Sequence, residues 1–395
     1  MAVPMTHHQN LKSQVNQRLQ QLKSDNLYRT AKSITNNADG TCVFQGRTIV
    51  NFSGNDYLNL AHDTAPSPQY QQVANSIVGS TASALVSGRS IWHERLEKQL
   101  AQFEETEAAL LFPTGYAANL GIMTGLVQSE DLVLCDKDNH ASIIDACRQC
   151  AGRMLVFRRD RLDQLERTLQ KRRTEFRHAF IVCDGVYSMD GTVPDLKRIV
   201  KLAERFEAAV IVDEAHGTGI LGKNGRGASE ACEVENQIFA RIGTMSKAMG
   251  GIGGFVVSNQ ATIDLLRHTA RTQFFSTALP PAICAAMLES LRIIQSEPNR
   301  RLTLQSLVQQ AHYLCQEFQL QTIESGLAPI IPIVIGNSLL VQQVSQQLLE
   351  QGFLVPAIRP PTVKSGTDRL RLSLNIHHTT DQIRHVCQIV KQHCR

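Results

Sequence analysis

The chain has 395 residues, of which 43% are hydrophobic and 19% are charged, and its formal net charge is +4. These values are typical of an ordinary globular protein with more than one lobe, and no basic block indicates binding to nucleic acid or to an anionic membrane. Because no apolar run is long enough to span a bilayer and the first eight residues lack the apolar core of a signal peptide, we expect a cytoplasmic protein.

The first predicted element is an amphipathic helix, because Leu11, Val15, Leu19 and Leu22 recur at helical spacing. Two short strands are expected next, at 42–44 and 48–50. From about residue 90, helices alternate with apolar strands, which are expected at 108–112, 132–135, 154–157, 179–183, 209–212, 238–242 and 254–257. This alternation predicts an α/β protein with a mostly parallel central sheet that helices cover on both faces.

The pattern changes after Pro280 and Pro281. Helices to about residues 296 and 318, two apolar strands and a closing helix from Asp381 predict a smaller α+β lobe. The expected organisation is an N-terminal helix with short strands over 1–50, a large domain over 51–282 and a small domain over 283–395.

The chain has ten cysteines, and Cys147 and Cys150 form a CxxC pair with His140 upstream. A zinc or redox site of this type needs a second ligand pair at metal spacing, which the sequence lacks. The favoured interpretation is that these cysteines pack as small apolar side chains, so no metal is expected.

The main chemical signal is Lys247, which lies among small and hydroxyl residues about thirty positions after the segment 213–219. A lysine in this setting suits the covalent capture of an aldehyde as a Schiff base, and nearby hydroxyls suit a phosphate. Asp213 closes an apolar strand and suits the role of charge partner for a pyridinium nitrogen. The sequence therefore predicts a pyridoxal-phosphate site. Its polar residues follow predicted strands, at the sheet edge where ligands of parallel sheets bind.

Seven segments, taken in order, resemble the α-oxoamine synthases. These fold-type-I pyridoxal-phosphate enzymes condense an amino acid with an acyl thioester and release carbon dioxide, so the resemblance implies their transferase fold, with a mostly parallel sheet and a smaller C-terminal lobe. The segments are 51–58, 112–119, 139–142, 185–191, 213–219, 243–250 and 275–277.

The resemblance also implies roles for individual residues. Lys247 holds the cofactor and later acts as the base, Asp213 pairs with the pyridinium nitrogen, His216 hydrogen-bonds the phenolic oxygen, and His140 stacks on the ring. Further cofactor contacts are implied for Gly115, Tyr116, Ser188 and Thr244, and for Ser276 and Thr277 of the other subunit of a homodimer with shared active sites.

Within the family, residues 357–374 resemble the 8-amino-7-oxononanoate synthases. These enzymes of biotin synthesis join L-alanine to a pimeloyl thioester, carried by CoA or by acyl-carrier protein. Arg371 matches the arginine that grips the amino-acid carboxylate, where a planar fork is suitable, and Asn55 assists it. The other implied substrate contacts are Arg359, Thr362 and, at the far carboxylate of the acyl chain, Arg29.

Three departures from the family pattern bear on the acyl donor: Asp184 replaces the usual glutamate, residues 79–84 carry few of the usual glycines, and Lys364 replaces a frequent proline.

The alternatives left open are a 2-amino-3-ketobutyrate CoA ligase, which uses glycine and acetyl-CoA, and a synthase that uses another acyl-CoA. A remote alternative is a P-loop ATPase, because 213–216 spell a Walker B box and 217–224 nearly spell a phosphate loop. That loop ends in Asn224, without the hydroxyl that magnesium needs.

Overall fold

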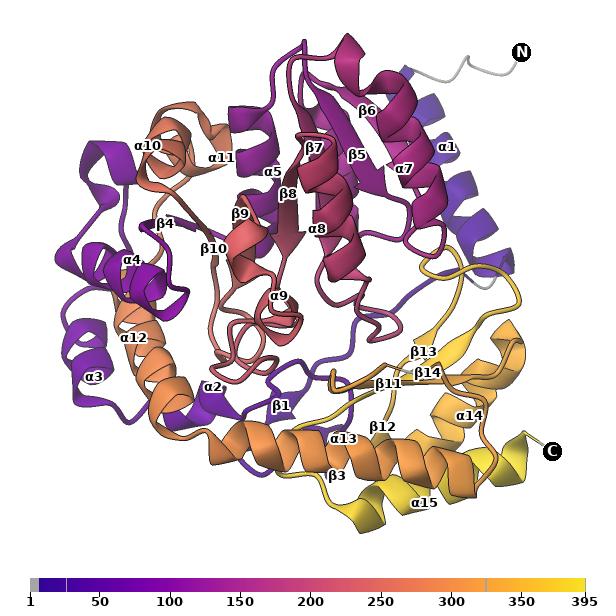
Figure 1. Cartoon of the computed structure of the whole chain (residues 1–395). Helices are drawn as coiled ribbons and strands as arrows, with labels where there is room; N and C mark the ends of the chain where they lie inside the picture. Colours follow the sequence, from indigo (N-terminus) through magenta and orange to yellow (C-terminus); the bar gives the residue numbers. More distant parts are fainter. Residues whose placement is uncertain (1–6, 26, 324, 395) are drawn as a thin grey trace, which may run out of the picture.

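The structure is a computed structural model that describes residues 7–25, 27–323 and 325–394. Its central feature is a seven-stranded sheet (Figure 1). Its strand order is β4-β10-β9-β8-β7-β5-β6. The pairs from β9 to β6 are parallel, whereas β10 is antiparallel to both of its neighbours. The prediction of a mostly parallel sheet is confirmed. The strands are β4 (Ala108–Phe112), β5 (Leu132–Asp136), β6 (Arg153–Phe157), β7 (Ala179–Asp184), β8 (Ala209–Asp213), β9 (Ala240–Thr244) and β10 (Gly254–Ser258).

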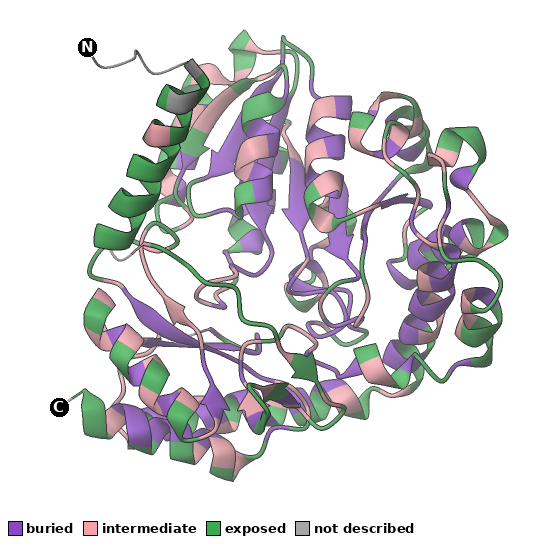
Figure 2. Ribbon diagram, turned by 180° about the vertical axis from the view of Figure 1, so that it is seen from behind, coloured by how far each residue is buried: buried purple, intermediate pink, exposed green. Residues whose placement is uncertain are grey.

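Both faces of this sheet are buried, which explains why its strands are continuous apolar runs rather than alternating ones. In β7, Ile181 packs into the core cluster on one face and Val182 into the cluster on the other. Figure 2 shows the buried strands between helices that are exposed on their outer sides. The helices of this region are α4 (Ile91–Phe103), α5 (Gly115–Leu126), α6 (Ala141–Gln149), α7 (Leu162–Arg172), α8 (Leu196–Arg205), α9 (Ala228–Ala231), α10 (Gln260–Thr269) and α11 (Arg271–Phe274).

Strand β9 differs from the prediction, because it begins at Ala240 rather than at residue 238 and continues to Thr244. Its pairing with β10 explains the extension, since Thr244 lies opposite Gly254 at the end of that ladder. The strand therefore runs to within three residues of Lys247.

The C-terminal region forms a three-stranded antiparallel sheet, β11-β14-β13, with helices around it. The predicted helices and strands are present, and a further helix that the sequence did not predict, α14, lies between the two longer strands. The elements are α12 (Pro281–Ser296), α13 (Asn299–Glu317), β11 (Ile330–Val334), α14 (Ser338–Glu350), β13 (Ala357–Ile358), β14 (Arg369–Ser373) and α15 (Thr380–His393).

The N-terminal strands share a sheet with a C-terminal strand. Its order is β1-β2-β3-β12, and β12 runs parallel to β3. The N-terminal elements and β12 are α1 (His7–Ser24), β1 (Thr35–Asn36), β2 (Thr41–Phe44), β3 (Arg47–Asn51), α2 (Leu60–Asp63), α3 (Pro68–Ala74) and β12 (Phe353–Leu354). The predicted domain boundaries near residues 50 and 282 stay a prediction.

Helix α1 forms as predicted, but its apolar stripe is largely exposed. Leu11, Val15, Leu19 and Leu22 are each 41–54% accessible. In the described part of the chain, no helix has the length and apolar character needed to cross a membrane.

Candidate active site

The predicted site residues gather at the carboxyl ends of the central strands. Asp213 is the last residue of β8, and Lys247 follows β9 by three residues. His140 follows β5 and caps the start of α6, while Gly115 opens α5 directly after β4. Since β4 and β5 run in the same direction as β8 and β9, all of these ends lie at one edge of the sheet.

Asp213 is buried and holds two hydrogen bonds from the protein. Its Oδ2 accepts from Asn119 Nδ2 at 2.6 Å and its Oδ1 accepts from the Ala215 backbone N–H at 2.8 Å. Asn119 also donates to Ser142 Oγ at 3.1 Å, which ties α5 to the start of α6. The carboxylate is thus fixed in direction, as a partner for a cationic ring nitrogen must be. A role for Asn119 is not predicted from the sequence, although this residue lies within the family segment 112–119.

Lys247 lies in the loop after β9 and is partly buried. Burial lowers the pKa of its amine to about 8, against the opposing effect of the Asp213 and Asp184 carboxylates. About a tenth of the amine is therefore neutral at pH 7, and the neutral amine is the form that attacks an aldehyde.

The start of α5 lies against the end of β9. A Cβ atom added to Gly254 would lie 2.7 Å from Gly115 Cα, so the backbone leaves no room for a side chain there, and one added to Gly115 would lie 3.3 Å from Thr244 Oγ1, which is a tight contact. Thr244 Oγ1 lies 2.8 Å from Ser246 Oγ. Hydroxyls and the unpaired N–H groups of a helix start thus meet at one place, which fits a phosphate dianion. The Tyr116 side chain instead donates to Asp145 on α6. The predicted phosphate contact of Tyr116 therefore falls to its backbone N–H.

His216 is buried, and Lys247 and His140 lie near enough to influence its charge. Its Nδ1 lies 2.7 Å from the Tyr57 hydroxyl. Burial, reinforced by the charges of Lys247, Arg371 and His140, lowers the pKa of His216 well below its ordinary value, so the ring is neutral at pH 7.

His140 is held from two sides. Its Nδ1 lies 2.7 Å from Ser142 Oγ, and its backbone N–H donates to Asp184 Oδ2 at 2.7 Å. Asp184 ends β7 in register with Asp213 on β8. Burial, and then the nearby Asp213 charge, raise the pKa of Asp184 well above its ordinary value. The departure from the family glutamate therefore lies inside the candidate site, where it positions the His140 loop.

Two predicted substrate-side residues, Arg371 and Asn55, meet a predicted cofactor contact, Ser188, around one guanidinium. Arg371 is buried on β14, and its Nε donates to the Ser188 carbonyl at 2.6 Å. Its Nη2 donates to Asn55 Oδ1 at 3.3 Å. Ser188 follows β7, so β14 reaches the edge of the large sheet through this contact. Arg371 lies close enough to Lys247 that its charge helps to lower the pKa of the lysine.

The predicted acyl-side residues also meet, although they lie 333 positions apart in the sequence. Arg29 Nη2 donates to Thr362 Oγ1 at 3.1 Å, and the Thr362 backbone N–H donates to the Arg359 carbonyl at 3.0 Å. Thr362, Ser188 and Lys364 line a cavity of about 500 Å³. Ser188 also contacts Arg371, so this cavity lies between the Arg371 cluster and the loop that carries Arg359 and Thr362.

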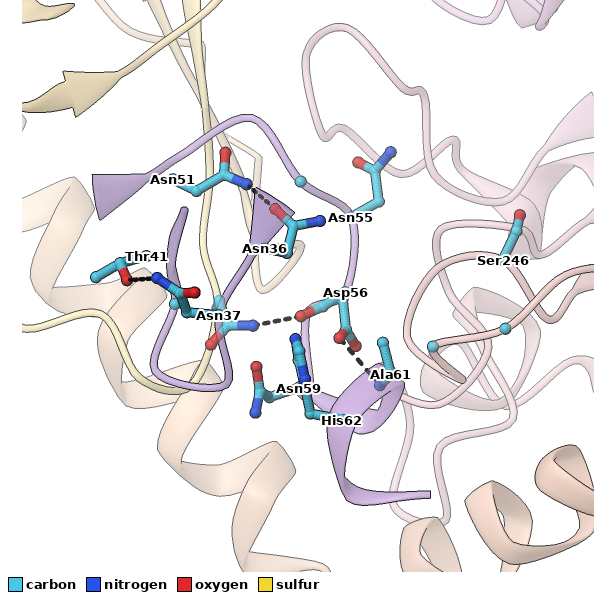
Figure 3. A pocket seen from close by; sticks show the side chains of 15 residues that line it. Asn36, Asn37, Thr41, Asn51, Asn55, Asp56, Asn59, Ala61, His62 and Ser246 are labelled. Carbon is cyan, nitrogen blue, oxygen red and sulfur yellow. Dashed lines mark hydrogen bonds between the residues drawn. The ribbon is translucent and has the colours of Figure 1, made fainter. Parts of the chain in front are cut away.

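A second cavity, of about 230 Å³, lies between the N-terminal strands and the loop that carries Lys247. Figure 3 shows its amide-rich lining, with Asn55 and Ser246 among the labelled side chains. Because Asn55 also contacts Arg371, this cavity adjoins the same cluster.

Ser276 and Thr277 lie in the segment after α11. Thr277 pairs with Ser83 in an isolated bridge, and Ala278 N–H donates to the Ala82 carbonyl at 3.0 Å. Their predicted contact across a subunit interface needs a second chain and stays a prediction.

The two other chemistries considered find little support in the geometry. In the described residues, no three His, Cys, Asp or Glu side chains group as metal ligands, and Cys147 and Cys150 pack in the core. The loop 217–224 leads into a bridge between Thr218 and Arg226 rather than into a helix, so it cannot cradle a phosphate as a P-loop does.

Comparison with known proteins gives consistent matches. The family model described as aminotransferase class I and II matches residues 47–390. The chain is 39% identical to 8-amino-7-oxononanoate synthase 2 of Bacillus subtilis, over 95% of this chain and 96% of the relative. It is 40% identical to the 8-amino-7-oxononanoate synthase of Geobacter sulfurreducens, over 91% and 92%.

Solved structures match as well. A serine palmitoyltransferase from S. paucimobilis with bound PLP–myriocin aldimine aligns with a TM-score of 0.90, at 29% identity and with 98% of each chain covered. The 8-amino-7-oxononanoate synthase of Francisella tularensis aligns with a TM-score of 0.76, at 29% identity, over 87% of this chain and 97% of that one. The chain therefore belongs to the aminotransferase class I and II family of fold-type-I pyridoxal-phosphate enzymes, and within it the chain is similar to the 8-amino-7-oxononanoate synthases, which are α-oxoamine synthases.

Proposed function

We propose that the chain catalyses the decarboxylative condensation of L-alanine with a pimeloyl thioester, giving 8-amino-7-oxononanoate, carbon dioxide and the free thiol carrier. The enzyme is an acyltransferase of the biotin-pathway class that uses pyridoxal phosphate. The observation that carries the substrate proposal is the Arg371 cluster, because a buried guanidinium beside the lysine loop supplies a carboxylate site next to the reactive amine.

The cofactor, when bound, supplies an electron-withdrawing ring that stabilises negative charge on the substrate α-carbon. In this proposal Lys247 holds the cofactor aldehyde and moves the α-proton, since its lowered pKa lets the amine accept a proton near neutral pH. Asp213 would keep the ring nitrogen protonated, and His140 would contact the ring. The start of α5 and Thr244 hold the phosphate.

On the substrate side, Arg371 holds the alanine carboxylate with help from Asn55. This grip orients the α-carbon towards Lys247 and shields the reacting bond from water. The acyl chain is proposed to occupy the cavity of about 500 Å³, with its far end beside Thr362, a lining residue whose hydroxyl accepts from Arg29 and whose N–H donates to the Arg359 carbonyl. A cationic side chain at that end suits the terminal carboxylate of a pimeloyl chain.

We also propose that the enzyme works as a homodimer, in which Ser276 and Thr277 of one subunit contact the phosphate in the other. An exposed apolar patch beside this segment supports the proposal. Val78 and Val86 are 91% and 81% accessible, and Phe275 is 67% accessible. Residues 82–83 pair with 277–278, which brings the patch and the segment together. Exposed apolar side chains gathered in this way mark interaction surfaces.

The experiment that tests the substrate proposal is a matrix of donors and acceptors. Purified enzyme is mixed with alanine, glycine or serine and with pimeloyl-CoA, acetyl-CoA or pimeloyl-acyl-carrier protein, and thiol release is followed. We expect the fastest turnover with alanine and a pimeloyl donor. Turnover with glycine and acetyl-CoA alone would instead establish a 2-amino-3-ketobutyrate CoA ligase.

A further inference from the structure

Tyr57 is a fully buried residue with no role so far, yet its hydroxyl contacts the candidate site directly. This hydroxyl lies 2.7 Å from His216 Nδ1 and 3.2 Å from Asn55 Oδ1. We propose that Tyr57 is a positioning residue, whose hydroxyl donates to His216 Nδ1 and keeps the single proton of the imidazole on Nε2. The inference rests on the proposed function and on the role that the family resemblance implies for His216, a hydrogen bond to the phenolic oxygen of the cofactor.

The direction of the hydrogen bond follows from the number of protons. A tyrosine hydroxyl has one proton, so it donates to one neighbour only, and His216 Nδ1 is the nearer acceptor. Asn55 Oδ1 has a second donor in Arg371 Nη2 at 3.3 Å, so it stays hydrogen-bonded when Tyr57 donates elsewhere. Burial raises the pKa of the Tyr57 hydroxyl, which therefore keeps its proton at neutral pH.

The tautomer of His216 then follows. The ring is neutral because it is buried and because Lys247, Arg371 and His140 disfavour a further positive charge. A neutral imidazole has one donor and one acceptor nitrogen, so a ring that accepts at Nδ1 must donate at Nε2. A phenolic oxygen that carries negative charge needs a donor, and the opposite tautomer would present a lone pair to it.

The backbone holds Tyr57 where this bond requires it. Its N–H donates to the Asn55 carbonyl at 2.9 Å, and its carbonyl accepts from the Ile376 N–H at 3.1 Å. The backbone of Tyr57 is thus held by its own segment on one side and by the C-terminal segment after β14 on the other. The same tyrosine therefore links the substrate-side cluster to the cofactor-side histidine.

The test compares the wild type with Tyr57→Phe, which removes only the hydroxyl, and with Tyr187→Phe as a matched control. Tyr187 is also buried, and in the described part of the chain its hydroxyl has no hydrogen-bond partner. Each full-length protein is labelled with ¹⁵N-histidine and measured by NMR with pyridoxal phosphate bound and after its removal. The His216 signals are identified by their loss in His216→Asn.

We expect Nδ1 without a proton and Nε2 with one in the wild type and in Tyr187→Phe. In Tyr57→Phe we expect a mixture of the two tautomers, together with a shifted pH midpoint of the visible absorption band of the bound cofactor. A protonated Nδ1 in the wild type overturns the inference, and so do wild-type signals in Tyr57→Phe. If Tyr57→Phe does not fold, the wild-type tautomer alone decides.

These outcomes are separable from the proposed function. The tautomer is measured on protein without cofactor as well, so it is obtained whether or not the chain condenses alanine with a pimeloyl donor. A chain that lacks this activity but shows the expected tautomer would refute the proposed function and leave the hydrogen bond from Tyr57 standing.

Discussion

The lowered pKa of Lys247 predicts how fast the cofactor-free enzyme captures pyridoxal phosphate at each pH. With a pKa of about 8 instead of the ordinary 10.5, the neutral fraction of the amine at pH 7 is larger by about 300-fold. Only the neutral amine attacks the aldehyde. The capture rate should therefore rise about tenfold per pH unit below pH 8 and level off above it.

The assay mixes cofactor-free enzyme with pyridoxal phosphate between pH 6 and 10, quenches with borohydride, and quantifies the reduced adduct on Lys247 by peptide mapping. The same reaction with N-acetyl-lysine in solution corrects for the pH dependence of the aldehyde itself. A corrected rate that continues to rise to pH 10 would show an unperturbed amine and refute the reasoning. Adduct on another lysine would refute the site.

Four further predictions concern the site and the exposed apolar patch. Asp213→Asn should keep the fold but lower turnover by several orders of magnitude, because a neutral ring nitrogen withdraws electrons poorly; a loss below tenfold would remove Asp213 from the mechanism. Arg371→Ala should weaken alanine binding about 30- to 5,000-fold in a spectroscopic titration, and wild-type affinity would point to Arg369 instead. Asn119→Ala should weaken cofactor binding about 10- to 150-fold, measured by equilibrium dialysis, because Asp213 loses a charge-assisted hydrogen bond; unchanged affinity would contradict that contact. Val86→Asp should yield monomers in sedimentation if the apolar patch is the subunit interface, whereas an unchanged dimer would place the interface elsewhere.

The sequence predicted the order of the main elements, because long apolar runs such as 179–183 are unambiguous when both faces of a sheet are covered. It did not predict α14, whose glutamine-rich stretch gives a weak periodic signal. It placed β9 two residues early, because the end of that strand depends on pairing with β10, a partner that periodicity does not reveal.

In the site, too, the sequence predicts some residues and not others. The motifs predict Lys247 and Asp213, since the chemistry demands these residue types at known spacings. It gives no indication that Tyr57 would touch His216, which lies 159 positions away. Nor does it show that Asp184 would hold the His140 backbone, because such contacts depend on the register of neighbouring strands.

The pairing of β3 with β12 has a consequence for how the chain is made. Val50 leaves the ribosome about 300 residues before Phe353, its partner in the ladder. At the usual rate of about 5–20 residues per second, β3 therefore waits roughly 15–60 s for its neighbour. During synthesis one edge of the N-terminal sheet remains open. The segment from Asn55 to Tyr57, which lies a few residues after β3, likewise gains its contacts with Arg371 and Ile376 only when translation is almost finished.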